Sequence, residues 1–231
     1  MKTRMNLLAS TVAVFAAFSS QLGKAQDKPR VGTTENWRVA TESFSRDNFK
    51  HPAWGYGHSK RVYKLAKTLA CADKAAVDDD VLFAAAMMHD IAAFPNWASA
   101  DKDHADKAVE ILPEMLRTNG FPKEMIPAVI EAVRTHMFDR KPALPEVVYI
   151  HDADTLDWLG AIGAYRLIAI VETGENQPDA KMALGLLEQR LAQAPAGVVS
   201  HAGKRELQKR RSSLKKILTE LRAQSRSFED L

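Results

Sequence analysis

Eight consecutive apolar residues, from Val81 to Met88, run directly into His89 and Asp90. Three aspartates at positions 78–80 precede the run, and acidic side chains suit the positive N-terminal end of a helix. A helix that is apolar on every face has to lie inside a fold. The run therefore predicts a central, buried helix that carries a polar His-Asp pair into the interior of the protein.

The remainder of the chain has helical periodicity almost throughout. Apolar residues recur at intervals of three and four over 57–76. Further helices are expected over residues 103–116, 123–136, 145–159, 160–171, 178–194 and 203–224. Turn-forming Gly and Pro residues separate these segments, and no alternation of apolar and polar residues is long enough for a convincing strand. The sequence therefore predicts an all-α fold, a single helical bundle of about eight or nine helices.

Residues 1–25 have the order of a secretory signal peptide. Lys2 and Arg4 precede an apolar run, and Gly23 and Ala25 stand at the small-residue positions of a cleavage site. A buried N-terminal helix is the alternative. No later apolar run approaches the ~20 residues that span a bilayer. We therefore expect an exported protein, periplasmic or secreted, with no transmembrane segment.

Composition gives no support for nucleic-acid binding. The chain carries 32 Lys and Arg against 29 Asp and Glu, which gives a formal net charge of +3. The leader alone contains Lys2, Arg4 and Lys24 and no acid, so the mature chain is neutral. No nucleic-acid partner is expected of a neutral chain, and the sequence carries no signal for an oligomeric state.

Ligand-type side chains recur on successive predicted helices. An unpaired buried charge is strongly unfavourable, and a divalent cation would satisfy both His89 and Asp90. For this pair alone, an ordinary His–Asp hydrogen bond at a helix end is an equal alternative. The other candidates are His58, His104, His136 and the aspartates of residues 151–157. Helical bundles build metal sites from such side chains on facing helices, so the set favours a metal site.

Four short motifs occur in order along the chain. His58 begins His-Ser-Lys-Arg-Val, and His89 and Asp90 stand in Ala-Met-Met-His-Asp-Ile. Asp152 begins Asp-Ala-Asp-Thr-Leu-Asp-Trp-Leu-Gly-Ala, and residues 204–207 read Lys-Arg-Glu-Leu. In this order the motifs resemble those of the HD-domain superfamily of metal-dependent phosphohydrolases. The last two also resemble motifs of a bacterial hydrolase subgroup within it.

The resemblance implies one HD-like helical metal-binding domain over residues 45–222, between an N-terminal arm at 26–44 and a C-terminal tail at 223–231. It implies an enzyme that hydrolyses a phosphoester or phosphoanhydride in a nucleotide-like or other small phosphorylated substrate. The attacking water would be activated by a metal. Members with four His and two Asp include mixed-valent di-iron oxygenases, which is one alternative function. A metal-binding module without turnover is another.

Residue by residue, the resemblance assigns His58, His89 and Asp90 to a first divalent metal ion. The last ligand is either Asp152 or Asp154. The family's last ligand follows an alanine, which favours Asp154. Side chains two positions apart on a helix point about 200° away from each other, so the two aspartates cannot serve one ion equally. Asp152 is expected to support the site from outside or to act as a cap.

The number of metal ions depends on two further histidines. Some branches of the superfamily place two His between the His-Asp pair and the final Asp, and bind a second ion that shares the Asp of the pair. His104 and His136 stand in that order. An exposed first-turn position is the alternative for His104. We expect one or two divalent ions, with Mn, Mg and Fe all compatible with the set.

A cation beside the metal ligands could contact a substrate phosphate. Arg61 follows His58 by three residues and is the candidate for this phosphate contact. Asp90 and Arg61 are thus the two residues expected to have catalytic roles. Most arginines on a helix surface are simply solvated, which is the alternative. The remaining histidines match no position of the family and are expected to have surface or capping roles. They are His51, His151 and His201.

Overall fold

The computed structural model describes residues 37–172 and 177–230. Within these ranges the chain forms nine α-helices, two short 3-10 helices and no β-strand. The predicted all-α fold is therefore confirmed. The predicted signal peptide at 1–25 lies outside the described residues, as does the first part of the predicted arm.

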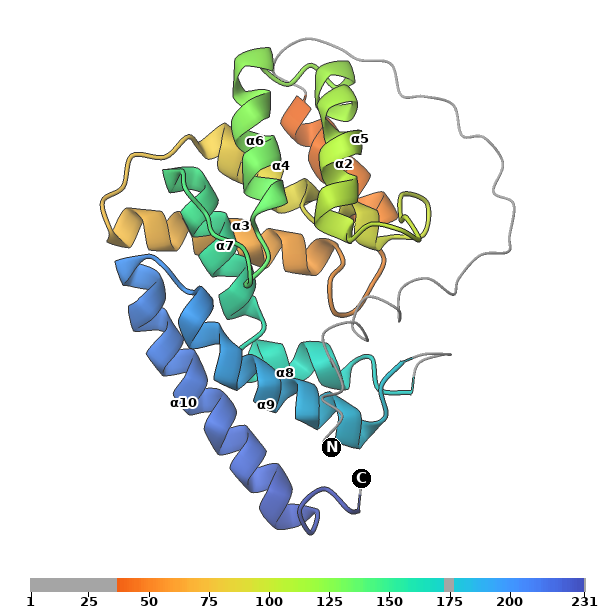
Figure 1. Cartoon of the computed structure of the whole chain (residues 1–231), viewed down its shortest axis with the longest axis vertical. Helices are drawn as coiled ribbons and strands as arrows, with labels where there is room; N and C mark the ends of the chain where they lie inside the picture. Colours follow the sequence, from red (N-terminus) through yellow and green to blue (C-terminus); the bar gives the residue numbers. More distant parts are fainter. Residues whose placement is uncertain (1–36, 173–176, 231) are drawn as a thin grey trace, which may run out of the picture.

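The helices form two groups around a central pair. Their bounds are α2 (Trp37–Asn48), α3 (Tyr56–Ala72), α4 (Asp79–Met88), η1 (Ile91–Ala93), α5 (His104–Thr118), η2 (Lys123–Met125), α6 (Ile126–Arg134), α7 (Pro145–Asp157), α8 (Gly160–Ile168), α9 (Ala180–Gly197) and α10 (His201–Gln224). Figure 1 shows α2, α4, α5 and α6 at one end of the molecule and α8, α9 and α10 at the other. Helices α3 and α7 pack on each other between the two groups.

Helix α4 is the buried central helix that the apolar run predicts. Every residue from Val81 to Met88 is buried. The Asp78 side chain caps the helix by accepting hydrogen bonds from two backbone N–H groups of the first turn, at 2.8 and 3.1 Å. His89 is the C-terminal cap residue. The pair His89 and Asp90 therefore enters the interior at the carboxyl end of this helix.

Helix α2 lies partly in the segment predicted to be the N-terminal arm. It begins at Trp37, inside the segment 26–44. Trp37 is buried, and its ring meets Phe83 and Phe121 edge-on, with centroids 5.8 and 4.7 Å apart. These contacts join α2 to the central helix.

The histidines expected outside the site have different environments. His201 is exposed at the start of α10. His51 accepts two backbone N–H groups of its own turn, at 3.2 and 3.3 Å, so the expected capping role is found there. His151 is fully buried, and its ring nitrogens contact the carbonyl oxygens of Thr135 and Gly197 at 2.9 and 2.8 Å. A surface role is therefore wrong for His151, which links the ends of α6 and α9.

Asp152 is a buried cap. Its two carboxylate oxygens accept the backbone N–H groups of Val199 and Ser200, each at 2.8 Å, directly before α10. Burial, only partly offset by these hydrogen bonds, raises the pKa of Asp152. The side chain therefore joins α7 to α10 on the side away from Asp154.

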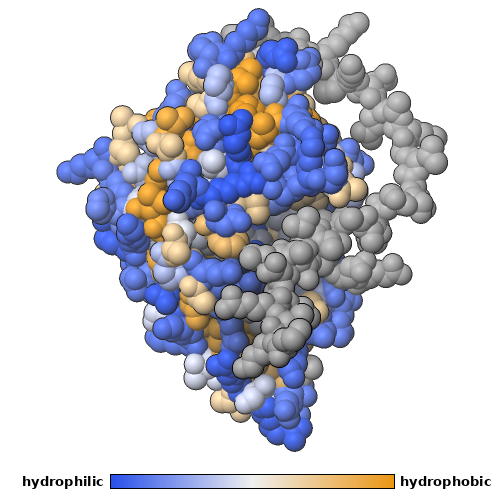
Figure 2. Space-filling model, viewed as in Figure 1, coloured by the Kyte–Doolittle hydropathy of each residue, from blue (hydrophilic) through white to orange (hydrophobic). Residues whose placement is uncertain are grey.

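The described helices give no membrane anchor. None of the helices in the described ranges combines the length and the apolar character that a bilayer crossing requires. Hydrophilic residues cover most of the face shown in Figure 2.

Gly163 allows α8 to approach the end of α7. A Cβ added at Gly163 would lie 2.2 Å from the carbonyl oxygen of Trp158. We expect Gly163→Ala to destabilise the protein by about 1–3 kcal/mol, because backbone must move to relieve the overlap. Gly185→Ala in α9 is the matched control, since a Cβ there meets nothing within 4 Å. Alanine should stabilise that helix by about 0.8–1 kcal/mol. Urea unfolding of both variants measures the difference, and a stabilised Gly163→Ala would contradict the close packing.

Candidate metal centre

Six predicted metal ligands meet at the junction of α3, α4, α5, α6 and α7. They are His58 on α3, His89 and Asp90 at the end of α4, His104 at the start of α5, His136 just after α6, and Asp154 on α7. All except His104 are buried, and the His104 side chain is 27% exposed. The structure therefore brings the whole predicted set together, and His104 lies at its open edge.

The first half of the cluster surrounds Nε2 of His58. This nitrogen lies 3.1 Å from Nε2 of His89 and 3.1 Å from a carboxylate oxygen of Asp154. Oδ2 of Asp90 lies 3.5 Å from the same nitrogen and 3.2 Å from Nε2 of His89. Four ligand-type side chains thus converge, and they include Asp154 rather than Asp152.

The second half of the cluster surrounds the other oxygen of Asp90. Oδ1 lies 3.3 Å from Nε2 of His104 and 3.7 Å from Nε2 of His136. The two imidazole nitrogens are 3.2 Å apart. The rings of His89 and His136 have centroids 4.9 Å apart, which joins the two halves. Asp90 therefore faces both histidine groups, one with each oxygen.

The orientation of the imidazoles fits a bound cation. Nδ1 of His58 lies 2.8 Å from a carboxylate oxygen of Asp157. Nδ1 of His89 and of His136 lie 2.9 and 2.7 Å from the carbonyl oxygen three residues earlier in the chain. These oxygens only accept, so each Nδ1 carries a hydrogen and each Nε2 faces inward. Lone pairs of His58 and His89 at 3.1 Å repel each other, unless a proton or a metal ion lies between them.

Electrostatics in the cluster favour positive charge. Burial opposes ionisation of Asp90 and Asp154, but the neighbouring imidazoles outweigh it and hold the pKa of both carboxyls well below the usual range. Burial also opposes a charge on His89, yet Asp90 raises the pKa of that imidazole to about 9. Burial lowers the pKa of His136 to about 3, so this ring is neutral. Two ionised carboxylates beside inward imidazole nitrogens, which bind a metal once they are deprotonated, are a donor set for a divalent cation.

Asp157 is one of the aspartates of residues 151–157, but no separate role in the site was predicted for it. It is buried and accepts from Nδ1 of His58 at 2.8 Å and from Nη1 of Arg166 at 3.1 Å. Burial opposes its ionisation, but His58, Arg166 and Arg61 together lower the pKa of Asp157 to about 2. Its spacing was the available signal, because side chains three apart on a helix share a face and Asp154 is on the same helix.

Arg61 is engaged by the same carboxylate. Its Nε and Nη2 donate to the two oxygens of Asp157 at 3.0 and 2.9 Å. The side chain is 31% exposed, so it lies at the rim of the site. A contact between Arg61 and a substrate phosphate stays a prediction. In the structure Asp157 already accepts from the guanidinium and would compete with the phosphate for it.

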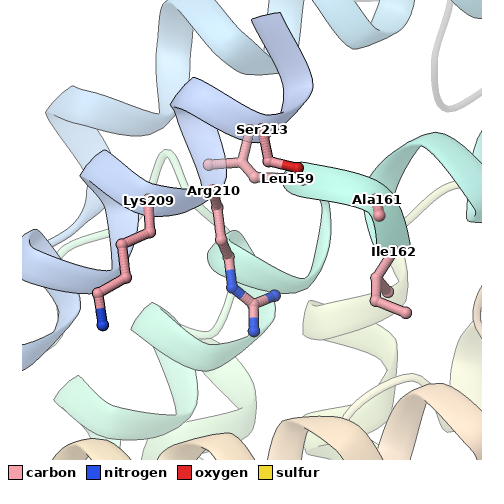
Figure 3. Close-up of a pocket in the computed structure, with 7 residues that line it drawn as sticks. Leu159, Ala161, Ile162, Lys209, Arg210 and Ser213 are labelled. Atoms are coloured by element: carbon pink, nitrogen blue, oxygen red, sulfur yellow. The ribbon is translucent and has the colours of Figure 1, made fainter. Parts of the chain in front are cut away.

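A depression elsewhere on the molecule is separate from this cluster. It has a volume of about 220 Å³ and lies between the start of α8 and α10 (Figure 3). Its lining residues are Leu159, Gly160, Ala161, Ile162, Lys209, Arg210 and Ser213. Arg210 donates to the carbonyl oxygen of Leu156 and to Glu206, at 3.0 and 2.9 Å. None of the six cluster residues lines it, so it adds nothing to the metal centre.

The segment around the cluster matches the model of a known protein family. The family model of the HD domain matches residues 55–159, which hold all six predicted ligands. Residues 55–159 are therefore similar to an HD domain. Helices α8, α9 and α10 follow the matched segment and pack on one another and on α7.

Solved structures share this fold beyond the matched segment. A Lactobacillus plantarum protein has a TM-score of 0.62 and 20% identity, over 84% of this chain and 98% of its own. A predicted HD superfamily hydrolase from an uncultured Thermotogales bacterium has a TM-score of 0.57 and 22% identity, over 84% and 94%. Bacillus subtilis YpgQ, solved in complex with ADP, has a TM-score of 0.61 and 18% identity, over 81% and 97%. A search of curated proteins found no match.

Proposed function

We propose that the protein is a metal-dependent hydrolase that cleaves a phosphoester or phosphoanhydride bond in a small phosphorylated substrate. The observation that carries this proposal is the position of Asp90. One of its oxygens lies 3.2 Å from His89 and the other 3.3 Å from His104. A carboxylate that faces two ligand groups is suited to share two cations, and two-metal sites are typical of enzymes that hydrolyse phosphate esters.

The comparisons support the reaction class and suggest a first substrate to try. Residues 55–159 match the HD-domain model, and one protein of similar fold is described as a predicted hydrolase of that superfamily. Another was solved with ADP. ADP is therefore the first compound to test, ahead of other nucleotides, sugar phosphates and cyclic dinucleotides.

Different residues of the cluster would bind the cation, orient the ligands and admit the substrate. A divalent cation held here would lower the pKa of a coordinated water toward neutrality and offset charge on phosphoryl oxygens. Asp157 holds the ring of His58 and keeps its Nε2 aimed into the cluster. Asp90 and Asp154 supply the negative charge that retains the cation. His104 is the only one of the six ligands that is not buried, so the substrate would reach the centre along the N-terminal end of α5.

A second candidate function has support from the same ligands. Four histidines and two aspartates come together, which is the inventory of the mixed-valent di-iron oxygenases. Metal identity separates the two reactions, because oxygenation needs a redox-active metal and hydrolysis does not.

The experiment is metal analysis followed by assays of the same sample. We propose that the protein acts outside the cytoplasm, supported by the leader pattern at residues 1–25, so the sample should come from the exported fraction.

Release of phosphate that depends on Mn or Mg supports the hydrolase. Two irons per chain and dioxygen consumption with a small polyol or phosphonate would overturn it in favour of the oxygenase. A metal-replete sample that is inert in both assays leaves the metal-binding module, and a cytosolic chain with an intact N-terminus contradicts export.

A further inference from the structure

Four arginines approach the C-terminal end of α7, and three of them are already paired. Arg210 donates to the carbonyl oxygen of Leu156 and to Glu206. Arg61 and Arg166 both donate to Asp157. Arg166 is fully buried and also donates from Nε to the carbonyl oxygen of Ala53 at 2.6 Å. Both guanidinium groups therefore hold the internal carboxylate that orients His58. The fourth is Arg190, on α9.

Arg190 contacts two segments that each follow a predicted metal ligand. One follows His136 and the other follows α7, which carries Asp154. The guanidinium carbon of Arg190 is 4.7 Å from the ring centroid of Phe138 and 5.4 Å from that of Trp158. Phe138 is two residues beyond His136, and Trp158 directly follows Asp157. Contact with both rings consequently places the guanidinium beside the metal centre, although α9 itself supplies no ligand.

Arg190 has no acceptor within the part of the chain that the structure describes. None of the described carboxylates lies within 4.0 Å of it, and none of the described oxygens accepts a hydrogen bond from it. Aromatic rings attract the face of a guanidinium but leave its five N–H groups unsatisfied. Burial lowers the pKa of Arg190, while the negative charges of Asp154 and Asp139 counteract that effect. The group thus remains a cation within the field of the cluster.

We propose that Arg190 binds a phosphate oxygen pair of the substrate beside the metal centre. This inference rests on the proposed function. A guanidinium has the planar, two-pronged geometry that matches two oxygens of one phosphate. Its stacking on Phe138 and Trp158 holds the fork in place before the substrate arrives, which reduces the entropy lost on binding. Arg190 therefore supplies the substrate contact that sequence analysis sought at Arg61.

The test is direct binding of inorganic phosphate and of pyrophosphate to the metal-loaded protein, measured by titration calorimetry. Arg190→Gln is expected to weaken binding about tenfold to a hundredfold, the effect of losing a charged hydrogen-bond donor. Its metal content should be unchanged, because Arg190 is not a ligand. Arg190→Lys keeps the charge but not the fork and should bind with intermediate affinity. Arg117→Gln is the matched control, since Arg117 is exposed on α5.

The outcomes separate this inference from the proposed function. Wild-type phosphate affinity in both variants overturns the role of Arg190, and so does loss of metal from Arg190→Gln. If Arg190→Gln does not fold, Arg190→Lys decides alone, and wild-type affinity in it overturns the inference. If the wild type hydrolyses no phosphoester but binds phosphate in an Arg190-dependent way, the proposed function fails and the inference stands. In an active enzyme, Arg190→Gln should raise KM more than it lowers kcat, because the contact is made in the bound substrate as well.

Discussion

Replacing Asp90 with alanine is expected to remove metal from both halves of the cluster and to abolish hydrolysis. Asp90 is common to the group with His58 and His89 and to the group with His104 and His136. Supporting residues of metal sites commonly contribute 10–100-fold to affinity or activity, so the loss of a shared ligand should exceed about 100-fold. The helical spectrum should persist, since the Asp90 side chain is not needed to form α4, which ends at Met88.

Two further variants make the result specific. His104→Ala should lose only the second ion, because His104 is absent from the group of His58, His89 and Asp90. Asp101→Ala removes an exposed carboxylate and should keep both the metal and the activity. Metal stoichiometry by plasma mass spectrometry and phosphate release are measured on all three. Wild-type metal content in Asp90→Ala would refute the assignment of this cluster.

That these candidate ligands come together could be predicted in part, because several of them are marked locally. The apolar run Val81–Met88 makes α4 central, and the run ends at His89 and Asp90 whatever the rest of the fold. His58 begins its motif at the start of a helix, and Asp154 follows an alanine in its own. These signals depend on residues a few positions away, so they could be read without knowing how the helices pack.

The partners of these ligands could not be predicted in the same way. Asp157 binds His58 across 99 positions of the chain. Its spacing from Asp154 indicates a shared helix face but does not identify His58 as the partner. Arg61, three residues after His58, was the candidate for a substrate contact, and its bond to that same Asp157 could not be foreseen. Trp37 lies in the segment 26–44, outside the extent of the family resemblance, although its ring packs on Phe83 of α4. Each of these features depends on long-range packing.

Asp157→Asn is expected to have the largest effect on stability of any single substitution considered. The carboxylate is buried and accepts hydrogen bonds from His58, Arg61 and Arg166. Asparagine keeps the size but removes the charge, which leaves Arg166 fully buried without its counter-ion. Removing one partner of a buried ion pair costs about 3–5 kcal/mol, a large share of the roughly 5–15 kcal/mol that stabilises a typical domain. Asp47→Asn, at an exposed position on α2, should change the free energy of unfolding by less than about 0.5 kcal/mol.

A second substitution shows whether the lost charge is the cause. In Arg166→Met the buried cation is gone, so adding Asp157→Asn to it should cost much less than Asp157→Asn costs in the wild type. Neighbours in one ion-pair network show such coupling, of about 0.5–3 kcal/mol. Arg61 and His58 still contact the carboxylate in Arg166→Met, so part of the cost should remain, and metal affinity in the half that contains His58 should still fall about 10–100-fold. Urea unfolding of the two single variants and the double variant measures the coupling. Strictly additive losses would mean that Arg166 and Asp157 stabilise the fold independently, and that the buried pair is not the reason Asp157 is needed.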